Sequence, residues 1–324
     1  MTKKTNPRIK LLFTASISLI VALLLFVLLL KNSSLASNEV RNALNLCSTM
    51  LIPSLFPLTV ASEIMTNSGA AYKLTRGLGA PFAKILGVSK NATAPYFLGL
   101  FGGYTSSCKS AVLLYREGKI SKRDCESIIA ISNMPSLAFM TGFIGIGIFE
   151  ISTVGWILWI ITVLSTLVLG VINRLFFRKN AEFYMGESVK TIQKKSLPKI
   201  IVDAISNSAF AMLIVCACVV FFSVLIAVFK QYLCEISFPE NAKQILLGLL
   251  EITSGISGST VIKNISSRAL ACAFLVGWSG LCVHFQVIAL CEDSDISFKK
   301  YFIFKALQGV ICFLIALIVF RFKF

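Results

Sequence analysis

The residues best placed to do chemistry in this sequence are polar side chains that follow two adjacent glycines inside an apolar stretch. The glycines are Gly102 and Gly103, and the polar residues after them include Ser106, Ser107 and Lys109. Adjacent glycines allow a helix to break at little steric cost. A helix that starts after such a break presents unpaired N–H groups and a positive dipole end, which favour an anion, and a lysine adds a full charge. We therefore predict that these five residues bind a small anionic solute.

A second candidate group combines a helix-breaking segment with the only histidine of the chain. The segment Asn133-Met-Pro-Ser136 is expected to interrupt a helix and expose backbone carbonyl groups. His284 follows a glycine-rich break, together with Ser279 and Gln286. As a ligand, His284 would hydrogen-bond the solute or carry a proton, and as a packing residue it would be a satisfied core side chain. Both readings stay open, and all five polar residues named here are assigned to the predicted binding site.

One carboxylate, Glu251, follows an apolar run and precedes Thr253 and Ser254. Acidic residues at membrane depth are rare and commonly functional. Glu251 could bind a coupling cation, hydrogen-bond the solute or be protonated, or it could be an exposed glutamate at a helix end. We include Glu251, Thr253 and Ser254 in the predicted site. The sequence does not say whether Na⁺ or H⁺ is the coupling ion.

The composition is that of a helical membrane protein. Of the 324 residues, 56% are hydrophobic and 14% are charged, which is enough for roughly eight to ten membrane-associated segments of about 20 residues. The net charge of +16 comes from lysines and arginines in short loops that orient such segments, so we expect no nucleic-acid partner. No HExxH, GxSxG or P-loop motif occurs, and one histidine does not build a metal cluster. We therefore predict neither an enzyme nor a bound metal or cofactor.

Charge and hydropathy divide the chain into four parts. Residues 1–38 are expected to form a transmembrane helix with a cytoplasmic N-terminus, and residues 39–178 a first repeat. Residues 179–199 are expected to be a basic cytoplasmic loop, because residues 174–199 hold seven basic and two acidic residues. Residues 200–324 are expected to form the second repeat.

The number of membrane crossings predicts that one N-terminal segment enters the membrane and returns. If all three apolar segments between residues 92 and 173 crossed, the basic loop would end outside the cell. The segment with the two glycines is the natural exception, so we predict a re-entrant hairpin over residues 92–124. We also expect a helix to break near Pro53, and the last span, about residues 301–320, to end on the cytoplasmic side.

The two halves of the chain resemble each other at two places. Residues 98–121 and 274–297, which are 176 positions apart, both read as an apolar run, a glycine-rich break, polar residues and a charged turn that ends in Ile-Ser. Residues 40–52 match residues 202–214 at an offset of 162. The first turn is net basic and the second net acidic, so the copies are expected to start on opposite sides of the membrane. The pattern predicts an all-α polytopic protein with an inverted repeat, whose site lies between the first hairpin and a second one over residues 243–297.

Five motifs, taken in order, resemble one family. The chain is similar to the YlbJ family of sporulation integral membrane proteins, within the nucleoside-recognition (Gate) superfamily. The motifs are Leu98–Lys109, Leu114–Ser121, Asn133–Phe139, Leu250–Gly255 and Gly280–Val287, and the matching blocks span residues 40–310. The first hairpin departs from the family pattern, because Thr105, Ser107 and Cys108 replace its usual Pro, Gly and Ala. The family's Asn-Pro-Ser-Pro is also replaced, by Met134-Pro-Ser-Leu137.

The resemblance implies a fold related to concentrative nucleoside transporters and a role in moving dipicolinic acid during spore formation. We therefore expect a secondary transporter of a small anionic solute in the bacterial cell membrane, with the outer forespore membrane as a more specific location. Two alternatives stay open: a transporter of a nucleoside-like solute, and a non-transporting scaffold of a sporulation complex. The lipid bilayer is an expected partner, and the sequence is compatible with a homo-oligomer.

Overall fold

The computed structural model describes residues 7–68, 70–177, 196–233, 239–292 and 294–323, and these residues form helices and connecting loops without strands. The predicted all-α class is confirmed. Five helical spans are long and apolar enough to cross a membrane. They are Ser33–Met65, Ser152–Phe177, Leu197–Gln231, Ile265–Leu290 and Lys299–Arg321. Most of the predicted loop at 179–199 lies outside the described residues.

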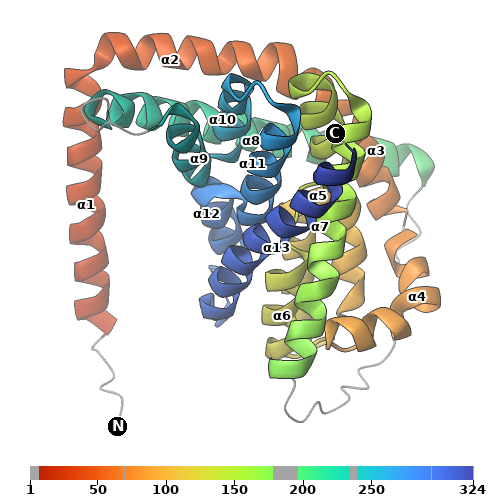
Figure 1. Cartoon of the computed structure of the whole chain (residues 1–324). Helices are drawn as coiled ribbons and strands as arrows, with labels where there is room; N and C mark the ends of the chain where they lie inside the picture. The colour runs from red at the N-terminus through yellow and green to blue at the C-terminus, as the bar shows by residue number, and fades with distance from the viewer. Residues whose placement is uncertain (1–6, 69, 178–195, 234–238, 293, 324) are drawn as a thin grey trace.

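The first helix stands apart from the body of the molecule. Helix α1 (Pro7–Lys31) is joined to the rest through α2 (Ser33–Leu46), which runs across one end of the body (Figure 1). A π-helical turn, η1 (Cys47–Leu51), then leads into α3 (Ile52–Asn67). The predicted break near Pro53 therefore takes the form of a widened turn just before the proline. The reason is that proline is tolerated in the first turn of a helix, where its missing N–H has no partner to lose.

Helix α5 (Thr93–Arg116) is a hairpin with its tip at Gly103. The residue has φ 76° and ψ −160°, so the predicted break at the two glycines is confirmed. The chain just before α5 contacts the chain just after it, since Asn91 Nδ2 donates to Lys119 O over 3.3 Å. A straight helix of this length would be about 36 Å long, so these ends can meet only if α5 folds back on itself. Helix α4 (Ala70–Leu86) leads into this hairpin.

A helix with an unwound centre follows the first hairpin. It consists of α6 (Lys122–Ser132), the extended residues 133–136 and the π-helical segment η2 (Phe139–Ile148). The predicted break at Asn133–Ser136 is confirmed. Pro135 accounts for it, because proline lacks an N–H and disfavours helical geometry in the residue before it. Helix α7 (Ser152–Ile172) and its π-helical end η3 (Asn173–Phe177) complete this half.

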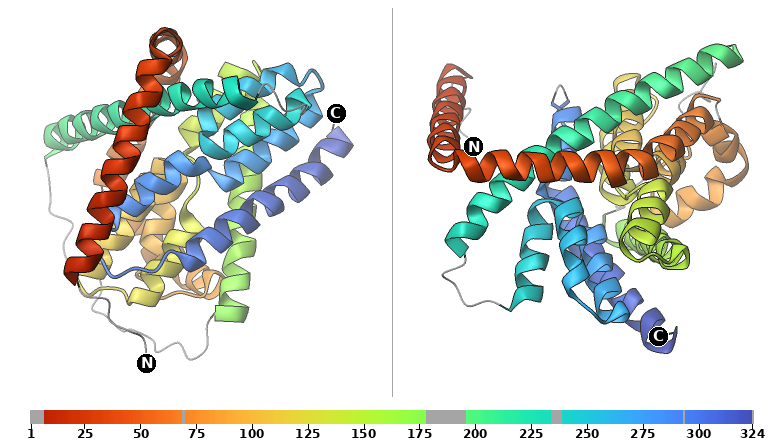
Figure 2. Two further views of the ribbon diagram at one scale, coloured as in Figure 1. Left: turned by 90° about the vertical axis from the view of Figure 1, so that its left-hand side faces the viewer. Right: turned by 90° about the horizontal axis from the view of Figure 1, so that it is seen from above.

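The C-terminal half begins with the long helix α8 (Leu197–Leu233), which crosses α2 and α3 and packs on both (Figure 2). A second hairpin follows, with Glu251 at its tip between α9 (Glu240–Leu250) and α10 (Ile252–Gly258). Its two arms are antiparallel, because Gly248 lies against Gly255. The remaining elements are η4 (Ser259–Val261), α11 (Ile265–Trp278), α12 (Gly280–Leu290) and α13 (Lys299–Lys323).

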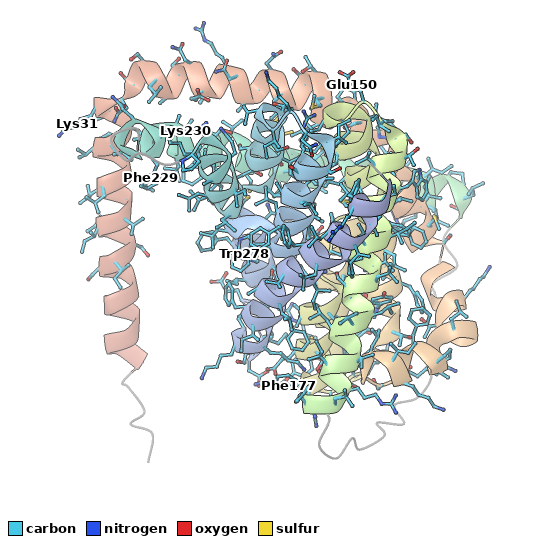
Figure 3. All side chains as sticks on the ribbon, in the orientation of Figure 1. Lys31, Glu150, Phe177, Phe229, Lys230 and Trp278 are labelled. Carbon is cyan, nitrogen blue, oxygen red and sulfur yellow. The ribbon has the colours of Figure 1, made fainter. Side chains whose placement is uncertain are left out.

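Two ends of the body can be named after labelled residues. Helix α7 runs from near Glu150 to Phe177, and these residues mark the Glu150 end and the Phe177 end (Figure 3). Helix α1 starts toward the Phe177 end, whereas α13 finishes toward the Glu150 end (Figures 1 and 2). The expectation that the last span returns to the side of the N-terminus is therefore wrong. The sequence could not show that α13 starts beside α7, where Lys300 Nζ donates to Asn173 Oδ1 over 2.5 Å.

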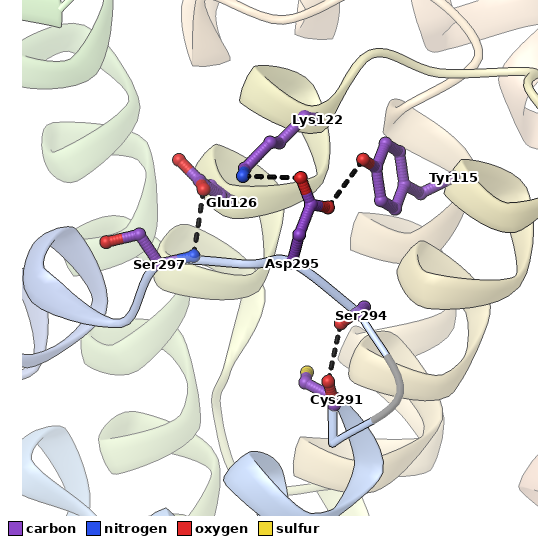
Figure 4. A network of polar contacts seen from close by, with 7 residues as sticks. All are labelled: Tyr115, Lys122, Glu126, Cys291, Ser294, Asp295 and Ser297. Atoms are coloured by element: carbon purple, nitrogen blue, oxygen red, sulfur yellow. Dashed lines mark hydrogen bonds and ion pairs between the residues drawn. The ribbon is translucent and has the colours of Figure 1, made fainter. Parts of the chain in front are cut away.

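The orientation predicted for the two repeated segments is also wrong. The turn after α5 and the loop after α12 meet (Figure 4), and Lys300, just beyond that loop, bonds Asn173 at the Phe177 end. Lys122 Nζ lies 2.7 Å from Asp295 Oδ2, and the Tyr115 hydroxyl donates to Asp295 Oδ1 over 2.7 Å. Residues 98–121 and 274–297 thus place their turns at the same end and are not inverted copies. The opposite charges of the turns, which suggested opposite sides, instead attract each other.

Candidate functional site

The tip of each helical hairpin packs against a segment where another helix is interrupted. The first break is residues 133–136, and the second break is Ser279 and Gly280. A Cβ atom added to Gly103 at the first tip would lie only 2.9 Å from the backbone nitrogen of Ser136 in the first break. A Cβ atom added to Gly280 in the second break would lie 3.0 Å from the backbone nitrogen of Ile252 at the second tip. The second break has left-handed backbone geometry, with φ 83° at Ser279 and 79° at Gly280. Non-helical backbone inside a membrane protein occurs where it is buried in protein or lines a cavity, so the tips and breaks form a candidate site.

A lysine of α13 reaches the first break. Lys305 is fully buried, and its Nζ donates to the backbone oxygen of Asn133 and to Gln308 Oε1, each over 2.8 Å. Its Nζ also lies 5.8 Å from the ring centre of Tyr104, next to the first tip. Gln308 is itself buried and donates to Ser165 Oγ over 3.3 Å. Within the described residues, no ion pair joins Lys305 to a carboxylate.

Histidine, tyrosine and asparagine side chains extend this group toward the second break. His284 Nδ1 lies 2.8 Å from the hydroxyl of Tyr301, which donates to Asn133 Oδ1 over 3.4 Å. The His284 ring also packs edge to face against Trp278, with ring centres 4.6 Å apart. We call the whole group the central polar cluster, and its members are Asn133, Ser165, His284, Tyr301, Lys305 and Gln308.

Two atoms of the central polar cluster have unused hydrogen-bonding capacity. Asn133 and His284 are each only 1% exposed. Asn133 Nδ2 and His284 Nε2 have no hydrogen-bond partner among the described residues. Leaving such a group buried without a partner costs about 1–3 kcal/mol, so buried polar atoms of this kind commonly face a ligand or water. The cluster can therefore hydrogen-bond a polar solute at the point where both halves of the chain meet.

The predicted residues of the first hairpin are only partly brought into this cluster. Gly103 forms the tip, while Ser106 Oγ donates to Gly102 O over 3.1 Å within the hairpin. Ser107 is buried and hydrogen-bonds Ser132 of α6. Lys109 is exposed, and no described contact joins it to the central polar cluster. The side-chain oxygen of Ser136 accepts a hydrogen bond from the backbone nitrogen of Phe139 over 3.2 Å.

Glu251 caps the N-terminus of α10. It is 2% exposed, and its two carboxylate oxygens accept hydrogen bonds from the backbone nitrogens of Thr253 and Ser254 over 2.8 and 2.5 Å. An N-cap carboxylate satisfies the unpaired N–H groups of a helix. The N-terminus of α10 is therefore occupied by a side chain of the protein. Gln286 Nε2 lies 3.4 Å from Cys282 Sγ of its own helix.

Four residues of the central polar cluster were missed by the sequence reasoning: Ser165, Tyr301, Lys305 and Gln308. One signal was available, because Lys305 is a charged residue in the predicted span over residues 301–320. Its neighbours carried no comparable signal. Serine, tyrosine and glutamine inside apolar helices are common enough that only their packing in space marks them.

The two halves of the chain also meet in an exposed polar network at the Phe177 end (Figure 4). In addition to the contacts of Asp295, the backbone nitrogen of Ser297 donates to Glu126 Oε1 over 2.9 Å. The ammonium of Lys122, followed by the hydroxyl of Tyr115, holds the pKa of the Asp295 carboxyl below its usual value. This network joins the base of the first hairpin to the loop between α12 and α13.

Comparison with known proteins finds one relative, which is an integral membrane protein. The sporulation integral membrane protein YlbJ of Bacillus subtilis (strain 168) is 25% identical over 310 residues, which cover 83% of this chain and 74% of that protein. No protein-family profile matches this chain, and no solved structure matches it. The integral-membrane relative and the five apolar spans make this a multi-pass membrane protein in contact with the lipid bilayer. Together with the ordered motifs, this similarity shows that the chain resembles a sporulation integral membrane protein over most of its length.

Proposed function

We propose that this protein is a secondary transporter of a small anionic solute, with dipicolinic acid as the first candidate, and not an enzyme. The similarity to a sporulation integral membrane protein supports a role in spore formation. The observation that carries the proposal is the pair of buried atoms without partners, Asn133 Nδ2 and His284 Nε2, beside the two breaks. Substrate sites of secondary transporters commonly lie at such broken helices, between repeats of opposite orientation.

The contacts support an inverted repeat, with a pairing that differs from the one the sequence suggested. The first hairpin has its base at the Phe177 end, since Leu86 O, shortly before α5, accepts a hydrogen bond from Asn173 Nδ2 over 2.7 Å. The backbone nitrogen of Ser89 also donates to Asp124 Oδ2 over 3.3 Å, which joins the two sides of this base. The second hairpin has its base at the Glu150 end, where Arg268 donates to Ile262 O over 3.0 Å and lies over the ring of Phe149. The two hairpins thus enter from opposite ends, which supports re-entrant hairpins around one central site.

The helices that follow the hairpins fit the same pairing. The segment α6–η2 starts at the Phe177 end and finishes near Phe149, whereas α11–α12 starts beside Phe149 and finishes near Asp295. Helix α7 ends where α13 begins, at the contact of Asn173 with Lys300. The pairs α5 with α9–α10, α6–η2 with α11–α12, and α7 with α13 are therefore related by reversed direction. Reversed halves around a fixed site are the arrangement expected for alternating access.

The two alternatives differ in what they require of the central polar cluster. A scaffold has no need for buried atoms without partners, which lower stability by about 1–3 kcal/mol each. A nucleoside-like solute could use Asn133 and His284, but it would leave the ammonium of Lys305 without an opposite charge. The proposal holds whether the coupling ion is Na⁺ or H⁺, and whether the protein is a monomer or a homo-oligomer.

Reconstituted transport tests the proposal. Purified protein in liposomes is expected to admit radiolabelled dipicolinate, with uridine as the comparison solute. Asn133→Ala is expected to abolish uptake, and Asn42→Ala, at an exposed position of α2, is the matched control that keeps it. Uridine uptake without dipicolinate uptake would favour the nucleoside-like solute. Folded wild-type protein that moves neither solute would contradict the transporter and favour the scaffold.

A further inference from the structure

We propose that Lys305 is the residue that anchors the solute, through an ion pair between its ammonium and one carboxylate of the solute. This inference rests on the proposed function and names the residue of the same site that binds the charge of the solute. The solute would be a small carboxylate, held between Lys305, Asn133 and His284. The anchoring lysine would thus lie on α13 and not in the first hairpin.

The first argument is that the charge of Lys305 is buried without an opposite charge among the described residues. Lys305 is fully buried in an apolar helix that is long enough to cross a membrane. Moving an ammonium out of water costs several kcal/mol unless an opposite charge or sufficient hydrogen bonds compensate it. Its two described acceptors, Asn133 O and Gln308 Oε1, are neutral. A bound carboxylate would supply the opposite charge that the described residues do not.

The second argument is that Lys305 and Asn133 have hydrogen-bond donors that no described residue uses. A lysine ammonium has three donors, and two of them are used within the described contacts. The residue that accepts one of them, Asn133, also carries the unpartnered Nδ2. Because Tyr301 donates to Oδ1 of the same amide, the NH₂ group of Asn133 points away from Tyr301. A carboxylate at Lys305 could therefore accept hydrogen bonds from both residues.

Contacts with neighbouring side chains orient the ammonium of Lys305. Gln308 lies one turn further along α13, accepts from Lys305 and is held by Ser165 of α7. Gln308 is thus a positioning residue for the ammonium. Two other lysines have different surroundings, since Lys109 is exposed and Lys300 is bonded to Asn173 at the Phe177 end.

Binding to a charge series of ligands tests the anchor. The probes share one ring and carry two, one or no carboxylates: dipicolinate, picolinate and 2,6-pyridinedimethanol. Calorimetry on wild-type protein in nanodiscs is expected to show affinity that falls along this series. Lys305→Gln is expected to weaken dipicolinate binding at least about tenfold and to leave the uncharged probe unaffected, whereas Lys305→Arg keeps part of the preference. Lys299→Gln is the matched control, because it removes the same charge from an exposed position of the same helix.

The possible results test the role of Lys305 separately from the proposed transport function. Dipicolinate binding by folded Lys305→Gln that equals wild type would overturn the anchor while leaving transport intact. Equal loss of affinity for all three probes would also overturn it, since a purely structural tie does not distinguish ligand charge. If Lys305→Gln does not fold, the wild-type charge series and Lys305→Arg decide the same question. Wild-type protein that neither binds nor moves a carboxylate would contradict the proposed function itself.

Discussion

A methyl group added at the first hairpin tip should damage the site far more than the same change elsewhere in the hairpin. The proposed perturbation is Gly103→Ala, with Gly118→Ala as its matched control. Both glycines have positive φ, 76° at Gly103 and 67° at Gly118, so both changes carry a conformational penalty. They differ in what the new Cβ atom would meet. Gly118 has nothing within 4 Å, whereas the Cβ atom at Gly103 would meet Ser136.

The magnitudes follow from these surroundings. The backbone geometry at Gly103, φ 76° and ψ −160°, is essentially restricted to glycine, and a side chain there costs about 1–3 kcal/mol. At Gly118 a positive φ costs about 1–2 kcal/mol. Gly103→Ala adds contacts of 2.9 Å to the backbone nitrogen and 3.1 Å to Cβ of Ser136. Because these atoms belong to the backbone and its first side-chain carbon, the tip and the break must move apart.

Stability and transport together test this reasoning. Thermal unfolding in detergent is expected to show a loss for both variants, with the larger loss for Gly103→Ala. Misplacing binding groups by about 1 Å costs enzymes on the order of 100-fold in activity, and we expect dipicolinate uptake to fall at least about tenfold in Gly103→Ala. Gly118→Ala should keep its uptake. Wild-type uptake by folded Gly103→Ala would refute a site built on the contact between the first tip and the first break.

Three further predictions concern contacts between the two halves of the chain. Asn173→Ala is expected to lower the free energy of unfolding by about 1–3 kcal/mol, because its buried side chain bonds the end of α4 and the start of α13; wild-type thermal stability would contradict this. Asp295→Asn is expected to change stability little at neutral pH, because an exposed ion pair such as Lys122–Asp295 contributes little to folding. Lys122 lowers the pKa of Asp295, so any stability that the pair contributes is fully present above pH 3.8, the ordinary pKa of an aspartate, and is lost only at lower pH. If the difference in unfolding free energy between wild type and Asp295→Asn changed within the neutral pH range, this reasoning would be wrong. A membrane-permeant thiol oxidant is expected to cross-link Cys108 to Cys291, whose buried sulfur atoms lie 3.5 Å apart, and mass spectrometry that finds either cysteine linked to a different cysteine would contradict the packing of α5 against the end of α12.

The breaks in the helices could be predicted from the sequence because their causes are local. Gly103 needs a backbone geometry open to glycine, and Pro135 removes a hydrogen-bond donor from its own segment. Glu251 was recognised as a carboxylate in an unusual apolar context, although the sequence did not reveal that it caps α10. The role of Glu251 toward a coupling ion stays a prediction.

The positions of these breaks relative to one another could not be predicted in the same way. Sequence similarity at an offset of 176 paired two segments whose turns lie at the same end, because apolar segments with glycines resemble one another in either direction. The direction of a helix in the body is decided by contacts with distant residues, such as Lys122 with Asp295. Charge counting also gave α13 the wrong direction.

The sequence by itself determined that this is a helical membrane protein and where its helices break, because composition and backbone geometry depend on each residue and its neighbours. Only the tertiary structure decided which tip faces which break, and which lysine lies among them. Lys109 had the favourable local context but is exposed, whereas Lys305 is brought to Asn133 by packing across 172 positions of the chain. The physical reason is that burial, and with it the strength of a charge, is a property of the packed helices and not of the segment that carries the residue.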